Sequence, residues 1–145
     1  MDIPTSAGPL LAPSRTLVMG VVNVTPDSFS DGGRYLALDA AVAHGRALVA
    51  DGADILDIGG ESTRPGSERV DAATEIERVV PVIEQLAGDA VISVDTINAV
   101  TAAAALRAGA AIVNDVSGGL ADPDMSRVVA EYGAIYLIQH WRGTP

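Results

Sequence analysis

The sequence predicts an α/β domain in which parallel strands alternate with single helices. The first observation is a unit that occurs four times: a helix-like stretch ends at glycine, and a short apolar strand soon follows. The second is that these strands show no alternation of polar and apolar residues, which is typical of a parallel sheet buried on both faces. Strands of this kind joined by single helices form β-α-β units, either in a barrel or in an open doubly wound sheet.

The strands can be taken in order along the chain. They are the apolar run 17–22 ending at Asn23, ILDIGG at 55–60, VISVDT at 91–96, IVNDVSGG at 112–119 and IYLIQH at 135–140. Each of the last four follows a glycine that is expected to close a helix in the left-handed conformation. These glycines are Gly52, Gly88, Gly109 and Gly133.

The helices are expected between the strands, at 39–51, 72–87, 97–108 and 123–132. Apolar residues in the second of these recur at the i, i+3, i+4, i+7 spacing of a helix with one buried face. Asp39 and Asp71 stand where N-caps belong, because a short carboxylate accepts from the free N–H groups of the first turn. Pro81 is expected to weaken or kink the second helix.

Composition restricts the function classes. The chain has 145 residues, enough for one domain with a core. A net charge of −10 disfavours nucleic acid and anionic membranes as partners. No apolar run approaches the ~20 residues of a membrane span. The lack of cysteine excludes disulfides and thiolate metal sites and fits a cytoplasmic protein. Residues 1–14, rich in Pro, Gly and Ser, are expected to form a flexible tail before a domain at 15–145.

Hydrogen-bonding side chains stand at the carboxyl end of every expected strand. They are Asn23, Asp57, Asp95-Thr96, Asn114-Asp115 and Gln139-His140. Any one of them can simply cap the helix that follows. Together they favour a polar ligand site, because parallel α/β folds bind ligands at this edge of the sheet. The neighbouring glycine pairs lack the GxGxxG pattern of dinucleotide sites, and a chain without lysine cannot form a P-loop.

The segments MGVVNVTPDSFSDGG, DIGGESTRPG, SVDT and NDVSGG resemble the dihydropteroate synthase family, in this order and at these strand ends. The resemblance covers about residues 17–142. It implies a (β/α)₈ TIM-barrel type, here a partial barrel with about five parallel strands and four helices. It also implies an enzyme of folate biosynthesis, a transferase that joins 6-hydroxymethyl-7,8-dihydropterin pyrophosphate to para-aminobenzoate.

The resemblance implies roles for individual residues. Asn23 matches a catalytic Mg²⁺ ligand, and Asp95 and Asn114 match the pair that binds the pterin. Asp95 would also stabilise positive charge on the pterin while pyrophosphate leaves with help from Mg²⁺. The aminobenzoate side would be formed by two loops, through Phe29, Ser62, Thr63, Arg64 and Pro65. Asp57 is expected behind the pterin-binding pair, Asp115 in the cap of the next turn, and His140 in a structural role.

The resemblance also has limits. A complete barrel takes about 250 residues, so the chain is expected to be the N-terminal half of a synthase, inactive alone and a homodimer when full length. Gln139 stands where the family usually carries methionine. Two other functions remain open: the pterin-binding barrel of a methyltetrahydrofolate methyltransferase, which has no use for the NVTPDSFSDGG and ESTRPG loops, and a non-catalytic pterin-binding module.

Overall fold

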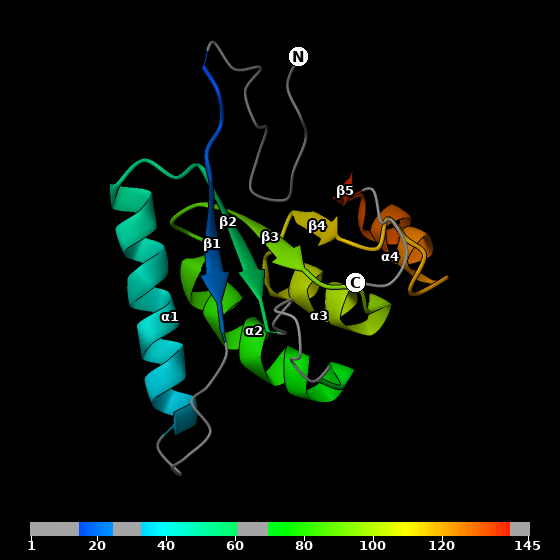
Figure 1. The fold of residues 1–145 in the computed structure, drawn as a ribbon, viewed down its shortest axis with the longest axis horizontal. Helices are drawn as coiled ribbons and strands as arrows, with labels where there is room; N and C mark the ends of the chain where they lie inside the picture. Colours follow the sequence, from blue (N-terminus) through cyan, green and yellow to red (C-terminus); the bar gives the residue numbers. More distant parts are fainter. Residues whose placement is uncertain (1–14, 25–32, 61–69, 140–145) are drawn as a thin grey trace.

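The computed structural model describes residues 15–24, 33–60 and 70–139 and contains one parallel sheet with four helices (Figure 1). The strands are β1 (Met19–Asn23), β2 (Ile55–Gly59), β3 (Val91–Asp95), β4 (Ile112–Asp115) and β5 (Ile135–Ile138). The helices are α1 (Gly33–Ala50), α2 (Ala72–Leu86), α3 (Ala99–Ala108) and α4 (Met125–Tyr132). The predicted number and order of strands and helices are confirmed.

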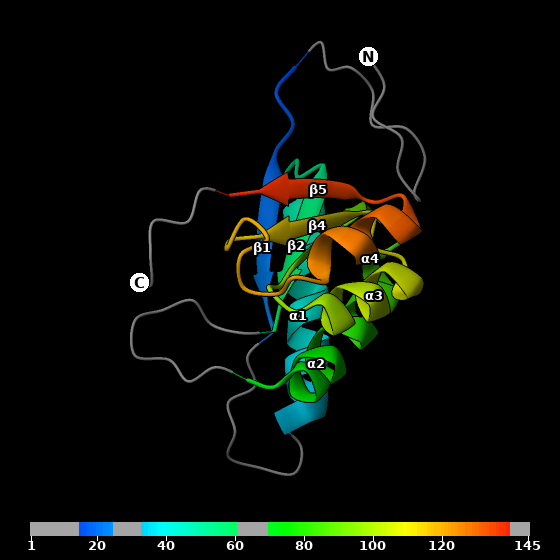
Figure 2. The same cartoon turned by 90° about the vertical axis from the view of Figure 1, so that its right-hand side faces the viewer.

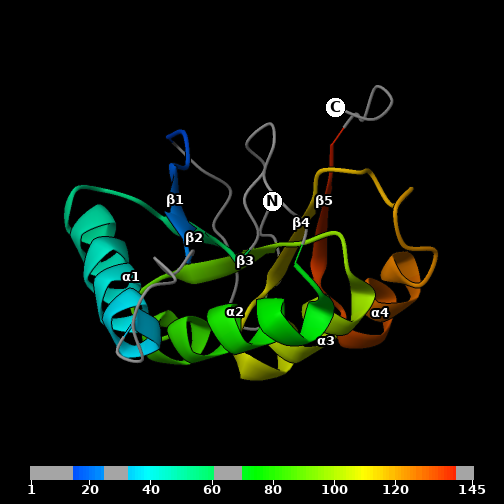
Figure 3. The same cartoon turned by 60° about the horizontal axis from the view of Figure 1, so that its bottom comes forward.

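The sheet topology distinguishes the two architectures that the strand pattern left open. The strands are hydrogen-bonded in the order β1-β2-β3-β4-β5, so each strand lies beside the next one in the chain. All four helices cover the same face of the sheet (Figures 2 and 3). A doubly wound sheet reverses its strand order and carries helices on both faces. The observed arrangement is instead that of a partial TIM barrel, with helices outside.

Two helix boundaries show which capping predictions hold. The side chain of Asp71 accepts from the Thr74 amide at 2.7 Å, which confirms Asp71 as the N-cap of α2. The prediction for Asp39 is wrong, because α1 begins at Gly33 and Asp39 lies inside it on the exposed surface. An aspartate on a solvated helix face does not need to mark a helix start. Pro81 also lies inside α2, which continues through it to Leu86.

The helix ends follow the glycine prediction with one exception. Gly133 caps α4 in the left-handed conformation (φ 62°), where its amide bonds to carbonyls of the last turn. Gly52 and Gly109 also have positive φ. Gly88 does not, because the cap of α2 is Ala87 in ordinary helical conformation. The prediction is therefore wrong at Gly88, where the helix ends without a left-handed residue.

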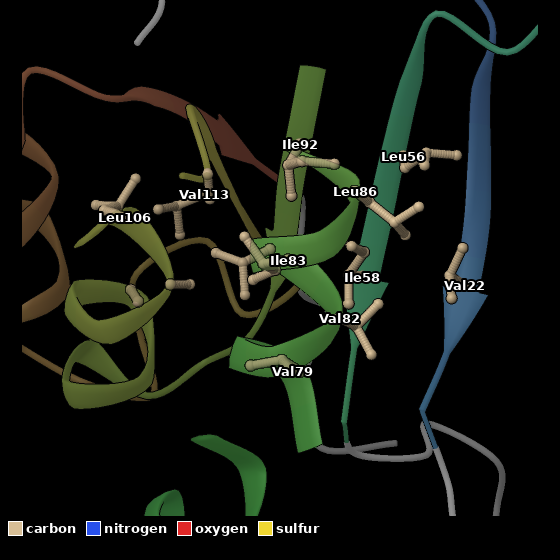
Figure 4. Close-up of a cluster of buried hydrophobic side chains, with 14 of the residues drawn as sticks. Val22, Leu56, Ile58, Val79, Val82, Ile83, Leu86, Ile92, Leu106 and Val113 are labelled. Carbon is tan, nitrogen blue, oxygen red and sulfur yellow. The ribbon is translucent and has the colours of Figure 1, made fainter. Parts of the chain in front are cut away.

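The main core lies between the sheet and the helices (Figure 4). From the strands it receives one aligned row of fully buried side chains: Val22, Ile58, Val94 and Val113. Opposite this row, α2 buries Val79, Val82, Ile83 and Leu86. Burying each such side chain contributes about 1.5–3 kcal/mol relative to exposure. This core fixes the positions of the strands, and hence of whatever stands at their ends.

The opposite face of the sheet, here called the inner face, is covered by no helix within the described residues. Its lower part, toward the amino ends of the strands, holds a small apolar cluster of Ile55, Ala111 and Ile112. Its upper part, toward the carboxyl ends, carries polar side chains. The same strands therefore present a continuous apolar core on one side and polar groups on the other.

Candidate ligand site at the carboxyl ends of the strands

The strand register aligns the predicted site residues in one row. Asn23 pairs with Gly59, Gly59 with Asp95, and Asp95 with Asn114 across β1 to β4. Residues paired in this way point to the same face of a sheet, and their neighbours one position earlier are buried against the helices. Asn23, Asp95 and Asn114 therefore all lie on the inner face. With strands about 4.8 Å apart, the row from Asn23 to Asn114 spans about 14 Å.

Asp95 lies beside a residue without a side chain. A methyl group at its register partner Gly59 would stand 3.4 Å from the Asp95 Cβ atom and 3.5 Å from its Oδ2 atom. Those are ordinary contact distances, so any larger side chain at position 59 would cover the carboxylate. Asp95 is half-buried, and position 59 on the neighbouring strand places no side chain against it. This geometry suits a carboxylate that receives the edge of a flat polar ligand.

The Asn114 amide is held in one orientation. Its Nδ2 atom donates to Asp57 Oδ2 at 3.2 Å, and its Oδ1 atom accepts from Gln139 Nε2 at 2.6 Å. The nitrogen and oxygen ends of the amide are therefore distinguished by their partners. One N–H and one lone pair remain beyond these two bonds. Asn114 can accordingly present both a donor and an acceptor to a ligand.

Asp57 supports this arrangement from below. It is buried on the inner face, two residues before the Gly59 position, and it accepts from Ser93 Oγ at 2.8 Å as well as from Asn114. Burial raises the pKa of the Asp57 carboxyl, and the hydrogen bonds from Ser93 and Asn114 oppose that shift. The structure thus places Asp57 behind Asn114, where it orients the amide.

Asp115 organises the turn after β4. Its Oδ1 atom accepts from the Ser117 amide at 2.9 Å and the Ser117 hydroxyl at 2.6 Å. Its Oδ2 atom accepts from the Gly119 amide at 3.1 Å and the Tyr136 hydroxyl at 3.0 Å. Burial and the bond to Asp115 raise the pKa of Tyr136 to about 12. The predicted capping role of Asp115 is confirmed, and its four bonds leave it fully engaged in the turn.

Sequence reasoning missed two supporting residues, Ser93 and Tyr136. Ser93 is completely buried, and its hydroxyl serves Asp57 on the neighbouring strand. The signal for it was a single hydroxyl inside the apolar run VISV. Tyr136 looks like one more apolar strand residue, and only the fold shows that its hydroxyl reaches the turn after β4.

Comparison with known proteins identifies the family. A family model described as pterin binding enzyme matches residues 19–145. The chain belongs to this family. The polar row on the inner face therefore lies in a member of the pterin binding enzyme family, which agrees with the resemblance found in the sequence motifs.

Relatives of this chain include dihydropteroate synthases. The chain is 57% identical over 133 residues to the one from Mycobacterium leprae, covering 91% of this chain and 46% of that protein. The solved synthase from Xanthomonas albilineans with 4-aminobenzoic acid matches with TM-score 0.80 and 48% identity, covering 90% and 48%. Its complex with 7,8-dihydropteroate matches with TM-score 0.82 and 41% identity, covering 98% and 52%. The chain spans about half the length of these relatives.

Several predicted site residues of this family member fall outside the described residues. They are Phe29, Ser62, Thr63, Arg64, Pro65 and His140. The tail at residues 1–14 lies outside them as well. The roles given to these residues stay predictions. Just before the predicted aminobenzoate residues 62–65, the structure describes Gly60, whose carbonyl accepts from Arg78 Nη1 at 2.8 Å. This hydrogen bond ties the end of β2 to α2.

Whether Mg²⁺ can bind at the strand ends depends on the oxygen atoms that the side chains there offer. Within the described residues, no group of three or more His, Cys, Asp or Glu side chains is placed to hold a metal. Asn23 is exposed at the end of β1 and offers one neutral amide oxygen. Mg²⁺ commonly takes one or two protein oxygens and completes its shell with water and substrate phosphates. Asn23 fits that mode of binding.

No helix among the described residues has the length and apolar character needed to cross a membrane.

Proposed function

We propose that this chain provides the pterin-binding half of a dihydropteroate synthase of folate biosynthesis. The reaction condenses 6-hydroxymethyl-7,8-dihydropterin pyrophosphate with para-aminobenzoate to give 7,8-dihydropteroate and pyrophosphate. The observation that carries the proposal is the alignment of Asn23, Asp95 and Asn114 on one face, in a chain similar to synthases solved with aminobenzoate and dihydropteroate.

The proposed pterin site uses the Asp95–Asn114 pair. The Asp95 carboxylate accepts from the 2-amino group and a ring N–H, which lie side by side on the edge of the heterocycle. Asn114 binds the pterin edge that carries both a donor and an acceptor. It uses the N–H and the lone pair that are not bonded to Asp57 and Gln139. Because the amide is already oriented, little reorganisation is needed when the ligand binds.

In the reaction, the carbon–oxygen bond between the pterin methylene and pyrophosphate breaks, and its electron pair leaves with pyrophosphate. The aminobenzoate nitrogen then donates its lone pair to the methylene carbon and loses one proton. The Asp95 carboxylate faces the pterin and stabilises the positive charge that develops on it. Asn23 would hold Mg²⁺, which supplies charge neutralisation for the leaving group when bound. Phe29, Ser62, Thr63, Arg64 and Pro65 are proposed to form the aminobenzoate side.

The test is aminobenzoate-dependent release of pyrophosphate by the complete gene product that contains residues 1–145. Release that requires both substrates supports the synthase. Pterin binding without release would instead indicate a non-catalytic binding module, and methyl transfer from a methylated folate would indicate the methyltransferase. Either result would overturn the proposal.

Two variants test the assignment of Asn23. Asn23→Ala removes the amide oxygen, so the Mg²⁺ concentration for half-maximal activity should rise about tenfold. Asn23→Asp keeps an oxygen donor at the same position and should stay close to the wild type. An unchanged Mg²⁺ dependence in Asn23→Ala would exclude Asn23 as a ligand.

We also propose that the complete protein is a cytoplasmic homodimer. Analytical ultracentrifugation of the complete gene product tests its assembly, and a monomer at micromolar concentration would contradict the proposal. Cell fractionation tests its location.

A further inference from the structure

Glu75 is a completely buried carboxyl group that the proposed reaction does not use. It lies in the first turn of α2, on the helix-covered side of the sheet. Its Oε1 atom accepts three hydrogen bonds, while its Oε2 atom has no hydrogen-bond partner among the residues that the structure describes. A buried carboxyl group is unfavourable unless its neighbours compensate it. Its presence here therefore calls for an explanation.

The three donors come from the segment that follows β3. Thr96 Oγ1 donates at 2.9 Å, Asn98 Nδ2 at 3.0 Å and Thr101 Oγ1 at 2.5 Å. Thr96 and Asn98 lie in the connection between β3 and α3, and Thr101 lies in α3. Glu75 thus ties the start of α2 to the whole connection that leaves the carboxyl end of β3.

Thr96 is the critical member of this network because it directly follows Asp95. Its amide donates to the Asn114 carbonyl at 3.2 Å, which links it to β4. Its hydroxyl accepts from the Asn98 amide at 3.1 Å while it donates to Glu75. The residue after Asp95 is therefore fixed through its backbone and its side chain. Asp95 is the last residue of β3, so Thr96 holds the backbone on its carboxyl side.

We propose that Glu75 is a positioning residue for Asp95. It does not touch the pterin; it acts through Thr96 to hold the Asp95 carboxylate in register with Asn114. This proposal rests on the proposed function, because it assigns the network a role in pterin binding. If the network served folding alone, its loss would lower the amount of active protein without changing the affinity of the protein that remains folded.

Thr96 and Thr101 offer a matched pair for the test. Both are buried threonines that donate to the same oxygen, but only Thr96 adjoins Asp95. Valine keeps the shape of either side chain and removes its hydroxyl. The probe is 6-hydroxymethylpterin monophosphate, and its Kd is measured on the folded complete gene product by calorimetry. Thr96→Val should raise the Kd about tenfold, since small displacements of a positioned group are costly, whereas Thr101→Val should change it less than about twofold.

Variants of Glu75 test whether its role depends on accepting hydrogen bonds or only on filling space in the core. Glu75→Ala removes the acceptor and should raise both the Kd for the pterin and the KM for the pterin pyrophosphate, leaving the KM for aminobenzoate unchanged. Glu75→Gln keeps one oxygen acceptor and should restore the Kd to within about threefold of the wild type. If Glu75→Ala does not fold, the Thr96→Val and Thr101→Val pair decides the question alone.

A second readout does not depend on the reaction. Hydrogen exchange of the backbone amides of residues 95–98 should become faster in Thr96→Val than in Thr101→Val. Folded Thr96→Val with wild-type Kd and wild-type exchange at these amides would overturn the proposal. A wild-type protein that releases no pyrophosphate would overturn the synthase assignment instead, and the Kd and exchange measurements would still decide the role of Glu75.

Discussion

The two faces of the sheet use alternate residues of the same strands for different purposes. On the helix-covered face, Val22, Ile58 and Val94 form an aligned row with no exposed surface. On the inner face, one position further along each strand, the row reads Asn23, Gly59 and Asp95. A difference of one residue in register thus separates the part of the chain that stabilises the fold from the part that presents ligand-binding groups.

This arrangement explains why the polar row can be placed accurately. The carboxylate and amides stand on strands whose other face is locked into the core, so their backbone positions are fixed by packing rather than by the site itself (Figure 4). The inner face can then contain a glycine beside Asp95 and a buried carboxyl at Asp57 without loss of the fold. Substitutions on the two faces test this separation of roles.

The first prediction concerns the helix-covered face. Ile58→Ala leaves a cavity where a fully buried side chain contacts the core beneath α2, and it should lower the free energy of unfolding by about 2–5 kcal/mol. The measurement is urea denaturation followed by circular dichroism. Ile58→Val is the control and should cost only about 0.5–1.5 kcal/mol. Equal losses in the two variants would show that this row does not carry the packing assigned to it.

The second prediction concerns the polar row. Asp95→Asn keeps the size of the side chain but replaces one acceptor oxygen by a donor and removes the charge. Affinity for the pterin should fall about 10- to 100-fold, as expected for lost hydrogen bonds to a charged group. Calorimetric titration measures the Kd.

Asp89→Asn is the matched control for this prediction. Asp89 is an exposed aspartate just before the amino end of β3, where it pairs with Arg46 at 3.4 Å. Its replacement should leave the Kd unchanged. Retained affinity in Asp95→Asn would refute the assigned pterin contact.

Much of this architecture could be predicted from the sequence because its signals are local. Runs of Val and Ile between helix-ending glycines identified five parallel strands, and the residues at their ends identified the edge that carries the polar row. The capping prediction for Asp71 was confirmed for the same reason, since a cap acts within one turn. Asp39 was assigned wrongly because its residue type fits an exposed helix position as well as a cap.

The hydrogen bonds that orient the site were not predictable in this way. Asp57 and Asn114 are separated by 57 residues in the sequence, and Glu75 and Thr101 by 26. Glu75 stands at helical spacing from the buried Val79, Val82 and Leu86, but a glutamate is rarely buried completely, so its residue type argued against a core position. Only the packing of α2 against the β3–α3 connection shows that this one is buried.

The third prediction uses two aspartates of opposite pH behaviour, Asp54 and Asp57. Bonds from Arg15 and the Val18 amide lower the pKa of Asp54 from 3.8 to about 2, so its stabilising effect is present above about pH 4 and lost as the pH falls toward 2. Burial raises the pKa of Asp57. The contribution of Asp57 to the free energy of unfolding is therefore greatest below its pKa in the unfolded chain, and it is lost as the pH rises through its pKa in the folded protein.

Urea midpoints measured from about pH 2 to pH 7 test these signs. Asp54→Asn should flatten the loss of stability at the acid end of the profile. Asp57→Asn should remove a loss that the wild type shows as the pH rises above about 4. The slopes are compared rather than the absolute midpoints, because Asp57→Asn also replaces an acceptor for Ser93 or Asn114. Parallel profiles for wild type and Asp57→Asn would show that the inner-face carboxyl titrates as it does in the unfolded chain.

The smallest effect is expected from Val21, which adjoins fully buried Val22 in β1 but faces the other way. Val21 is 53% exposed on the inner face. Val21→Ala in the 145-residue chain should therefore change the free energy of unfolding by less than about 0.5 kcal/mol, whereas Val22→Ala should cost at least about 2. Two adjacent valines with the same strand propensity differ here only in the face they occupy. Equal losses of unfolding free energy in the two variants would show that Val21 is packed as tightly as Val22. That result would contradict the difference between the helix-covered face and the inner face.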